Sequence, residues 1–202
     1  APGLRDALAA TGVGFASDDG AATGATLADL NGDGLPDLAR AKQGSTAHAW
    51  MSDGPRSGLL ETSTTALGER TTLGYGMSSA FPNTRADGVA GMPVTLPVVT
   101  TLTRSDGRGN DHTSTFSYQG GRFDAGSVRG FATATEVKPS GLRMVRHFHQ
   151  EPGLVGQAFL EEAYDSSGAL KARKTYTYAL VDAGDGIQQV RFTEQREETF
   201  DG

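Results

Sequence analysis

The sequence predicts an all-β protein, and three observations point to that class. Glycine is abundant, at 28 of 202 residues, and glycine is costly inside a helix but supplies the positive φ that tight turns require. Short runs of alternating polar and apolar residues are separated by clusters of Gly, Asp, Asn, Ser and Pro. No segment sustains the apolar period of an amphipathic helix. We therefore expect an antiparallel meander of hairpins, preceded by a strand-loop-strand unit.

The first part of the chain, residues 1–77, is expected to hold that unit and its linking strands. Residues Leu4–Ala10 would form one helical turn or a disordered lead-in. The runs Ala47–Met51, Leu59–Thr65 and Arg70–Tyr75 are typical of short strands bounded by turns.

Residues 78–97 are repeatedly broken by proline and glycine, which predicts an irregular connecting loop and a domain boundary. Residues 98–202 then show strand and turn signals in regular succession. Within them, the alternation in Thr115–Tyr118 and Lys174–Tyr178 places one strand face on a core and the other in water or a lumen. The expected strands are Val98–Arg104, His112–Tyr118, Val128–Val137, Arg143–His149, Ala158–Tyr164, Leu170–Leu180 and Val190–Thr199.

Composition and charge exclude several classes of function. The net charge of −6 argues against nucleic-acid binding, which requires clustered Lys and Arg. There is no cysteine, so disulfides, thiolate metal sites and thiol catalysis are absent. No apolar run approaches the roughly 18 residues needed to span a bilayer, and no signal peptide opens the chain. The ends, residues 1–3 and 199–202, look cut from something longer, so we expect a fragment of a larger protein.

The sharpest local signal is a loop with oxygen-bearing residues at alternate positions. A hard cation such as Ca²⁺ takes about six to eight oxygen ligands, and three carboxylates this close would repel each other without a cation. An EF-hand is not expected, because Arg40 stands where a bidentate Glu is needed and no helix pattern flanks the loop. The alternative is a metal-free turn rich in Asp and Asn. The candidate calcium ligands are Asp29, Asn31, Asp33 and Asp37 through their side chains and Leu35 through its carbonyl.

The stretch Leu27–Ala39, which contains this loop, resembles the FG-GAP/VCBS repeat, a calcium-loop unit of β-propeller blades. Only one copy is present, and a propeller needs several blades. The resemblance therefore implies the end of a propeller whose other blades lie upstream.

The segment Tyr164–Leu170 looks like a YD repeat of the RHS class. In a hairpin turn Asp165 would accept backbone N–H groups, Gly168 would take a positive φ, and Tyr164 and Leu170 would share a sheet face.

The order of the surrounding motifs extends this resemblance. From about Thr23 to Tyr178 the chain resembles the segment that links the propeller to the RHS shell in B components of Tc insecticidal toxins and related RHS-family virulence proteins. In such toxins the propeller contacts the translocation pore and the RHS strip encloses a toxic segment. The motifs are Leu67–Tyr75, Pro97–Val99, Asp106–Asn110, Tyr118–Asp124, Arg129–Phe131 and Phe148–Gln150.

The resemblance implies a non-enzymatic structural segment of a large bacterial protein, secreted or at the cell surface, that contributes to a β-strand shell. Its partners would be other segments of the same polypeptide or other toxin-complex subunits. A carbohydrate- or receptor-binding adhesion module, with a cell-surface glycan or receptor as partner, is the main alternative, and a hydrolase assembled across strands is a third.

Other candidate sites are weaker, and we expect no catalytic residue. His147 and His149 would share a strand face as half of a zinc site, but no third ligand is near in the sequence. Acidic residues at Glu161–Glu162 and within 194–198 are interpreted as solvated strand faces.

Overall fold

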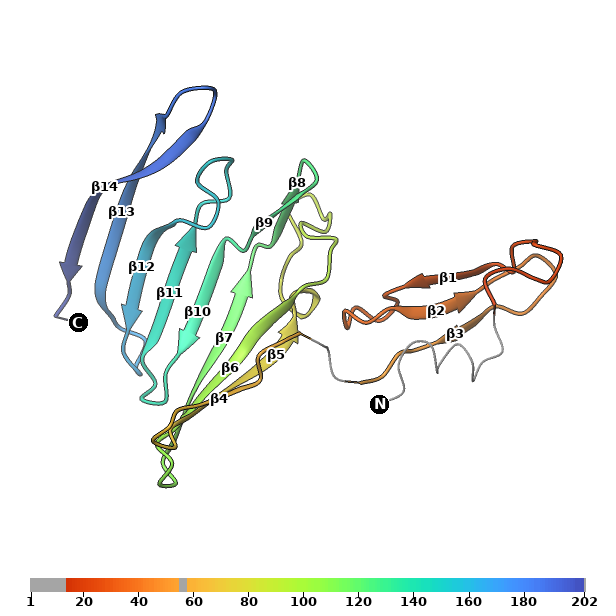
Figure 1. Cartoon of the computed structure of the whole chain (residues 1–202). Helices are drawn as coiled ribbons and strands as arrows, with labels where there is room; N and C mark the ends of the chain where they lie inside the picture. The colour runs from red at the N-terminus through yellow and green to blue at the C-terminus, as the bar shows by residue number, and fades with distance from the viewer. Residues whose placement is uncertain (1–13, 55–57, 202) are drawn as a thin grey trace. The chain divides into compact units, whose positions relative to one another are not determined.

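The computed structural model describes residues 14–54 and 58–201, which belong to two compact units, 1–59 and 60–202 (Figure 1). The expectation for Leu4–Ala10 lies outside the described residues. Within the described ranges, strands dominate and the one helical element is a 3₁₀ turn at Ser78–Ala80. The predicted all-β class is confirmed.

The first unit contains a three-stranded antiparallel sheet in the order β1-β2-β3. Leu38, on the middle strand, is buried and pairs across the sheet with Leu27 and Trp50. The candidate calcium loop is the β1–β2 connection, so the strand-loop-strand arrangement is as predicted. The strands are β1 (Ala25–Ala28), β2 (Asp37–Arg40) and β3 (His48–Trp50).

The second unit is built on a nine-stranded antiparallel sheet in the order β14-β13-β12-β11-β10-β7-β6-β5-β4, with β8 and β9 as a separate hairpin. Apart from that excursion, neighbours in sequence are neighbours in the sheet, as in a meander (Figure 1). The strands are β4 (Thr62–Thr64), β5 (Arg70–Met77), β6 (Pro97–Ser105), β7 (Asp111–Gln119), β8 (Arg122–Asp124), β9 (Ser127–Gly130), β10 (Thr133–Val137), β11 (Arg143–Phe148), β12 (Ala158–Tyr164), β13 (Leu170–Asp182) and β14 (Gln188–Thr199).

The expectation of a single strand over Val128–Val137 is wrong. The run divides into β9, which pairs with β8, and β10, which pairs with β7 and β11. Gly130 ends β9 with a φ of 75°, in the left-handed region that a continuing strand does not use. The backbone of Ala132 then turns to Gly120 and Phe148, to which it is hydrogen-bonded.

The division between the units falls between Leu59 and Leu60, whereas the sequence pattern placed a boundary at residues 78–97. The strands on either side of that loop, β5 and β6, pair along their length from Arg70–Ser105 to Met77–Pro97. Long hydrogen-bonded pairing holds both in one sheet, so the loop is an excursion within the second unit.

The 78–97 loop packs against the sheet that it leaves. Met77, Ser78 and Met92 are buried there. The Asn83 side-chain amide donates to the carbonyl of Ser78 at 2.6 Å, and its oxygen accepts the N–H of Gly121 at 2.8 Å. A single side chain therefore ties the start of the loop to the end of β7.

Three aromatic rings add to this contact. Phe81 meets Tyr118 edge to face at 5.3 Å between ring centroids, and the centroid of the Phe131 ring lies 4.9 Å from that of Tyr118. The Tyr118 hydroxyl donates to the carbonyl of Val99, and burial raises the pKa of this phenol.

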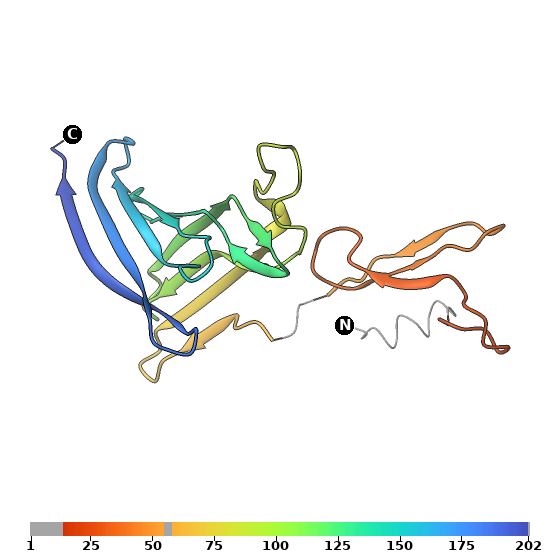
Figure 2. The ribbon, with the colours of Figure 1, turned by 90° about the horizontal axis from the view of Figure 1, so that it is seen from above.

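Beyond this region the nine-stranded sheet is a single curved layer (Figure 2). Among the described residues, the buried hydrophobic side chains are Leu38, Met77 and Met92, and most sheet residues are half-buried. A sheet of this size with so few buried side chains exposes apolar surface, against which other protein segments can pack.

Candidate metal centre

The β1–β2 loop is wrapped around the carboxylate of Asp29. One oxygen accepts the N–H groups of Gly32 and Asp33 at 2.8 and 3.0 Å, and the other accepts that of Gly34 at 2.9 Å. Gly32 and Gly34 take φ of 76° and 80°, which permit the tight reversal that turns these N–H groups inward.

Asn31 and Asp33 contact each other at the open side of the loop. The Asn31 amide donates to Asp33 Oδ2 at 2.8 Å, and Asn31 Oδ1 accepts the Asp33 N–H at 3.0 Å. Asp33 Oδ1 also accepts the N–H of Leu35 at 2.7 Å. These two candidate ligands therefore lie side by side.

Asp37 has a different environment, because its side chain is fully buried. Its two oxygens accept the N–H of Leu30 and the N–H of Ser52, both at 2.8 Å. Asp37 thus fastens the loop to the segment after β3, which gives it a role in the fold whether or not an ion is bound.

The donor chemistry of the loop fits a hard cation. An ionised carboxylate offers about four lone-pair sites, so Asp29 keeps about one and Asp37 about two beyond the bonds described above. Ca²⁺ prefers such an all-oxygen set. In the described ranges no three His, Cys, Asp or Glu side chains converge on one point.

The predicted turn after Tyr164 is confirmed in detail. Asp165 Oδ1 accepts the N–H groups of Ser167 and Ala169 at 2.9 and 3.0 Å, Gly168 has a φ of 90°, and Tyr164 pairs with Leu170. Hydrogen bonds from the Ser167 hydroxyl and then from the Ala169 N–H lower the pKa of Asp165 to about 2.

The two histidines do not converge on a metal site in the described structure. His147 faces Glu162 at 3.8 Å, whereas His149 faces Glu151 at 3.3 Å. Both rings contact Phe159, with centroids 6.0 and 4.9 Å away, so these histidines belong to an aromatic contact.

The carboxylates of β12 are paired across strands rather than solvated. Glu161 accepts from Arg146 at 3.1 Å, and Glu162 accepts from Arg173 at 2.8 Å. The sequence could not show these ion pairs, because each partner comes from a neighbouring strand whose register no local pattern specifies.

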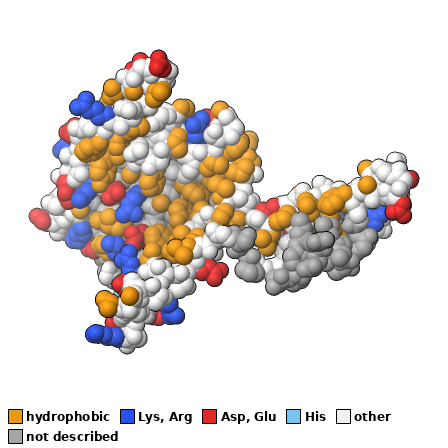
Figure 3. Space-filling view, viewed as in Figure 1, with side chains coloured by type: hydrophobic (Ala, Val, Ile, Leu, Met, Phe, Trp, Pro, Cys, Tyr) orange, Lys and Arg blue, Asp and Glu red, His pale blue; other side chains and the backbone are white. Residues whose placement is uncertain are grey.

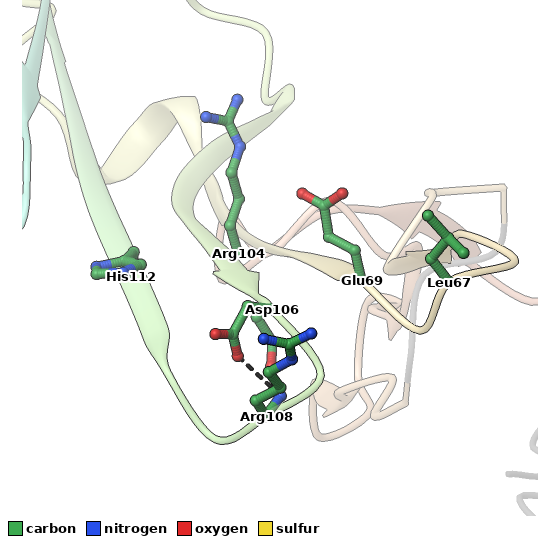
Figure 4. Close-up of a pocket in the computed structure, with 7 residues that line it drawn as sticks. Leu67, Glu69, Arg104, Asp106, Arg108 and His112 are labelled. Atoms are coloured by element: carbon green, nitrogen blue, oxygen red, sulfur yellow. Dashed lines mark hydrogen bonds between the residues drawn. The ribbon is translucent and has the colours of Figure 1, made fainter.

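A crevice of about 440 Å³ lies where the β4–β5 and β6–β7 turns approach each other (Figure 4). One of its two carboxylates, Asp106, accepts from the Asn110 amide at 2.6 Å and from the Arg108 N–H at 2.8 Å, and the Asn110 bond is the main cause of the lowered pKa of Asp106. Asp106 therefore closes a turn and is poorly placed to act as a base. The lining residues are Leu67, Glu69, Arg104, Ser105, Asp106, Arg108 and His112.

Comparison with known proteins gives one family. The profile described as "Insecticide toxin TcdB middle/N-terminal region" matches residues 12–145, well over half of the chain. No curated protein matches. No helix in the described ranges is long and apolar enough to cross a membrane. The matched range runs from before the β1–β2 loop into β11, so the chain belongs to the insecticide toxin TcdB middle/N-terminal region family.

Proposed function

We propose that this chain is a non-enzymatic structural segment of a large secreted, RHS-family toxin protein, in which it forms part of a β-strand wall and holds one structural Ca²⁺. The observation that carries the proposal is the open nine-stranded sheet of one layer with very few buried side chains. Such a sheet has the form of a wall, and each of its two faces can contact other protein or solvent.

Two rows of cross-strand partners, on opposite faces of the sheet at its β4–β7 end, differ in chemistry. On one face Thr62, Thr72, Thr103 and Thr113 form a row across four adjacent strands, because each is the cross-strand partner of the next. The hydroxyls of Thr103 and Thr113 are 2.8 Å apart. The opposite face carries Leu73 and Leu102 on β5 and β6, and Ser114 continues this row on β7.

The β1–β2 loop supports the calcium part of the proposal. Its sequence resembles the FG-GAP/VCBS repeat, and its tight reversal brings oxygen-bearing groups of a kind that Ca²⁺ prefers into one short loop: Asp29, Asn31, Asp33, Asp37 and the Leu35 carbonyl. The ion would neutralise adjacent carboxylates and hold the β1–β2 connection in one conformation. The Asp165 turn likewise supports a YD-type hairpin.

The partners that this role implies are other segments of the same polypeptide and other toxin subunits, since the family is that of a toxin. The absence of a catalytic role is supported by how the acidic groups are used: Asp106 and Asp165 close turns, and Glu161 and Glu162 pair with arginines.

A glycan array separates this proposal from the adhesion alternative. The structural role predicts no selective glycan binding by the unmodified chain. Selective binding that is lost in Phe192→Ala, an exposed ring on β14, would instead establish the adhesion module. Hydrolysis of a panel of ester, peptide and glycoside reporters, abolished by one carboxylate substitution, would contradict the non-enzymatic role.

A further inference from the structure

The three asparagines of the chain differ in the residue that follows each of them. Asn31 is followed by glycine, Asn83 by threonine and Asn110 by aspartate. The side-chain amide of an asparagine can react with the backbone nitrogen of the next residue, because the two lie in one chain and close a succinimide ring. Glycine has no side chain to shield that nitrogen. Asn31 therefore has the most accessible nucleophile of the three.

The structure leaves Asn31 exposed and restrains the other two asparagines. Asn31 lies at the surface of the β1–β2 loop. Asn83 is half-buried, and both ends of its side-chain amide are hydrogen-bonded. The Asn110 amide donates to Asp106 at 2.6 Å, and the residue after it begins β7, where pairing with Ser105 holds the backbone extended. Exposure and the following residue thus both select Asn31.

The hydrogen bonds around Asn31 and Gly32 favour the attack. The Gly32 N–H donates to Asp29 at 2.8 Å, and a carboxylate acceptor increases the electron density on the nitrogen that attacks. Asn31 Oδ1 accepts the Asp33 N–H at 3.0 Å, so a donor already faces the oxygen on which negative charge develops as the ring closes. The nucleophile and the electrophile are therefore both polarised within one turn.

We propose that Asn31 is a site of spontaneous covalent modification, at which the chain loses its side-chain amide without an enzyme. A bond forms between the Gly32 nitrogen and Asn31 Cγ while the Cγ–Nδ2 bond breaks, and the displaced nitrogen takes up the Gly32 proton and leaves as ammonia. One water molecule then opens the succinimide, at one carbonyl to give aspartate and at the other to give isoaspartate. This reaction goes beyond the structural role of the chain.

The aspartate product changes the charge balance of the loop. The Asn31 amide donates to Asp33 Oδ2 at 2.8 Å. An aspartate has no N–H to donate, so two carboxylates would face each other at the same place. Figure 3 shows acidic side chains on the visible face of the first unit, to which the product adds one more negative charge. A divalent cation would relieve this repulsion, and that step alone rests on the proposed calcium site.

The isoaspartate product changes the backbone. Its main chain runs through the side-chain carbon, so the loop becomes longer by one CH₂ group. The Asp29 carboxylate accepts the N–H groups of three successive residues, 32–34, which follow Asn31 directly. A longer backbone at residue 31 cannot keep all three bonds in place, so this product should open the loop.

The test uses the intact 202-residue chain, incubated in chelator at mildly alkaline pH, digested with trypsin and analysed by mass spectrometry. Each asparagine lies in its own tryptic peptide: 6–40, 71–85 or 109–122. Loss of the amide should be at least about tenfold faster at Asn31 than at Asn83 or Asn110. The same chain unfolded in urea is the reference, and the native rate at Asn31 should be within about threefold of the rate in urea.

Calcium provides a separate measurement on the same peptides. An ion bound to Asn31 Oδ1 would hold the side chain away from the Gly32 nitrogen, so saturating calcium should slow the reaction at Asn31 several-fold and leave Asn83 and Asn110 unchanged. Equal rates at Asn31 with and without calcium would remove this residue from the calcium ligands, while the modification site would stand.

Asn31→Asp reproduces the aspartate product. In chelator its first unit should melt at a lower temperature than that of the unmodified chain, and calcium should reduce the difference. Gln43→Glu adds the same charge to an exposed turn of the same unit, outside the loop, and should shift the melting temperature less. Equal melting of Asn31→Asp and the unmodified chain in chelator would contradict the repulsion with Asp33.

Two results would overturn the modification site. The first is an Asn31 peptide that stays unmodified in the native chain while the sample in urea reacts, because the fold would then protect the amide. The second is equal reaction at Asn31, Asn83 and Asn110 in the native chain, because neither the glycine nor the exposure would then select Asn31.

Discussion

Asp33 and Asp37 are both candidate calcium ligands, but they differ in what they do without an ion. Asp37 is fully buried and accepts two backbone N–H groups, whereas Asp33 is more accessible and is bonded within its own loop. The same spacing in sequence thus combines a residue required by the fold with one whose main role is expected only when calcium is present.

Substitution at these two positions should therefore give different calcium dependence. Asp37→Ala should destabilise the first unit in both the presence and absence of calcium, by about 1–3 kcal/mol for each N–H left unpaired. Asp33→Ala should lower stability mainly when calcium is present. Thermal unfolding of each variant in calcium and in chelator is the measurement, and equal effects of Asp33→Ala under both conditions would refute its role as a ligand.

Asp165 gives a prediction about pH. Its pKa is lowered from 3.8 to about 2, so the ionised form is favoured in the folded state. For a depressed carboxyl pKa, the stabilisation is present above the ordinary value and is lost as the pH falls through the folded value.

The difference in melting temperature between the unmodified chain and Asp165→Ala should thus be constant above about pH 5 and shrink between about pH 4 and pH 2. Asp111→Ala is the matched control, since the described structure records no side-chain hydrogen bond for this exposed carboxylate of the same sheet. A difference that does not vary with pH would show that the Asp165 bonds do not depend on its ionisation.

At the scale of elements, the sequence predicts most strands but not their lateral order. The alternation in β7 and the turn at Asp165 specify their own conformations, because period-two patterning and Asx-type turns are local effects. The division of Val128–Val137 was missed, since one glycine, Gly130, decides it and glycine also occurs within strands.

The candidate site was predictable to a similar degree. The candidate ligand positions from Asp29 to Asp37 were predictable from their spacing in the sequence. The burial of Asp37 was not, because it depends on a contact with Ser52, which follows β3 in the chain. The ion pairs of Glu161 and Glu162 likewise depend on strand register, which is a property of the folded sheet.

The 78–97 loop supplies a test at this scale. Asn83→Ala removes the side-chain bond between the loop and Gly121, just after β7, together with the bond to Ser78 at the start of the loop, and should cost about 1–3 kcal/mol. Trypsin cleavage after Arg85, within the loop, should become faster. Thr84→Ala changes the adjacent residue, whose side chain has no recorded hydrogen bond, and should leave cleavage unchanged. Equal cleavage rates in the two variants would show that Asn83 does not hold the loop.

For the whole molecule, the division into two compact units separates the two parts of the proposed function. The calcium loop belongs to the first unit, and the nine-stranded sheet belongs to the second. An ion that binds only the folded loop stabilises the unit that contains it, by an amount that grows with its concentration.

Scanning calorimetry of the unmodified chain in chelator and at rising calcium concentration tests this account most directly. We predict that the unfolding transition of the first unit moves to higher temperature with calcium while that of the second unit stays in place. Identical unfolding at every calcium concentration would contradict a structural calcium site in the β1–β2 loop.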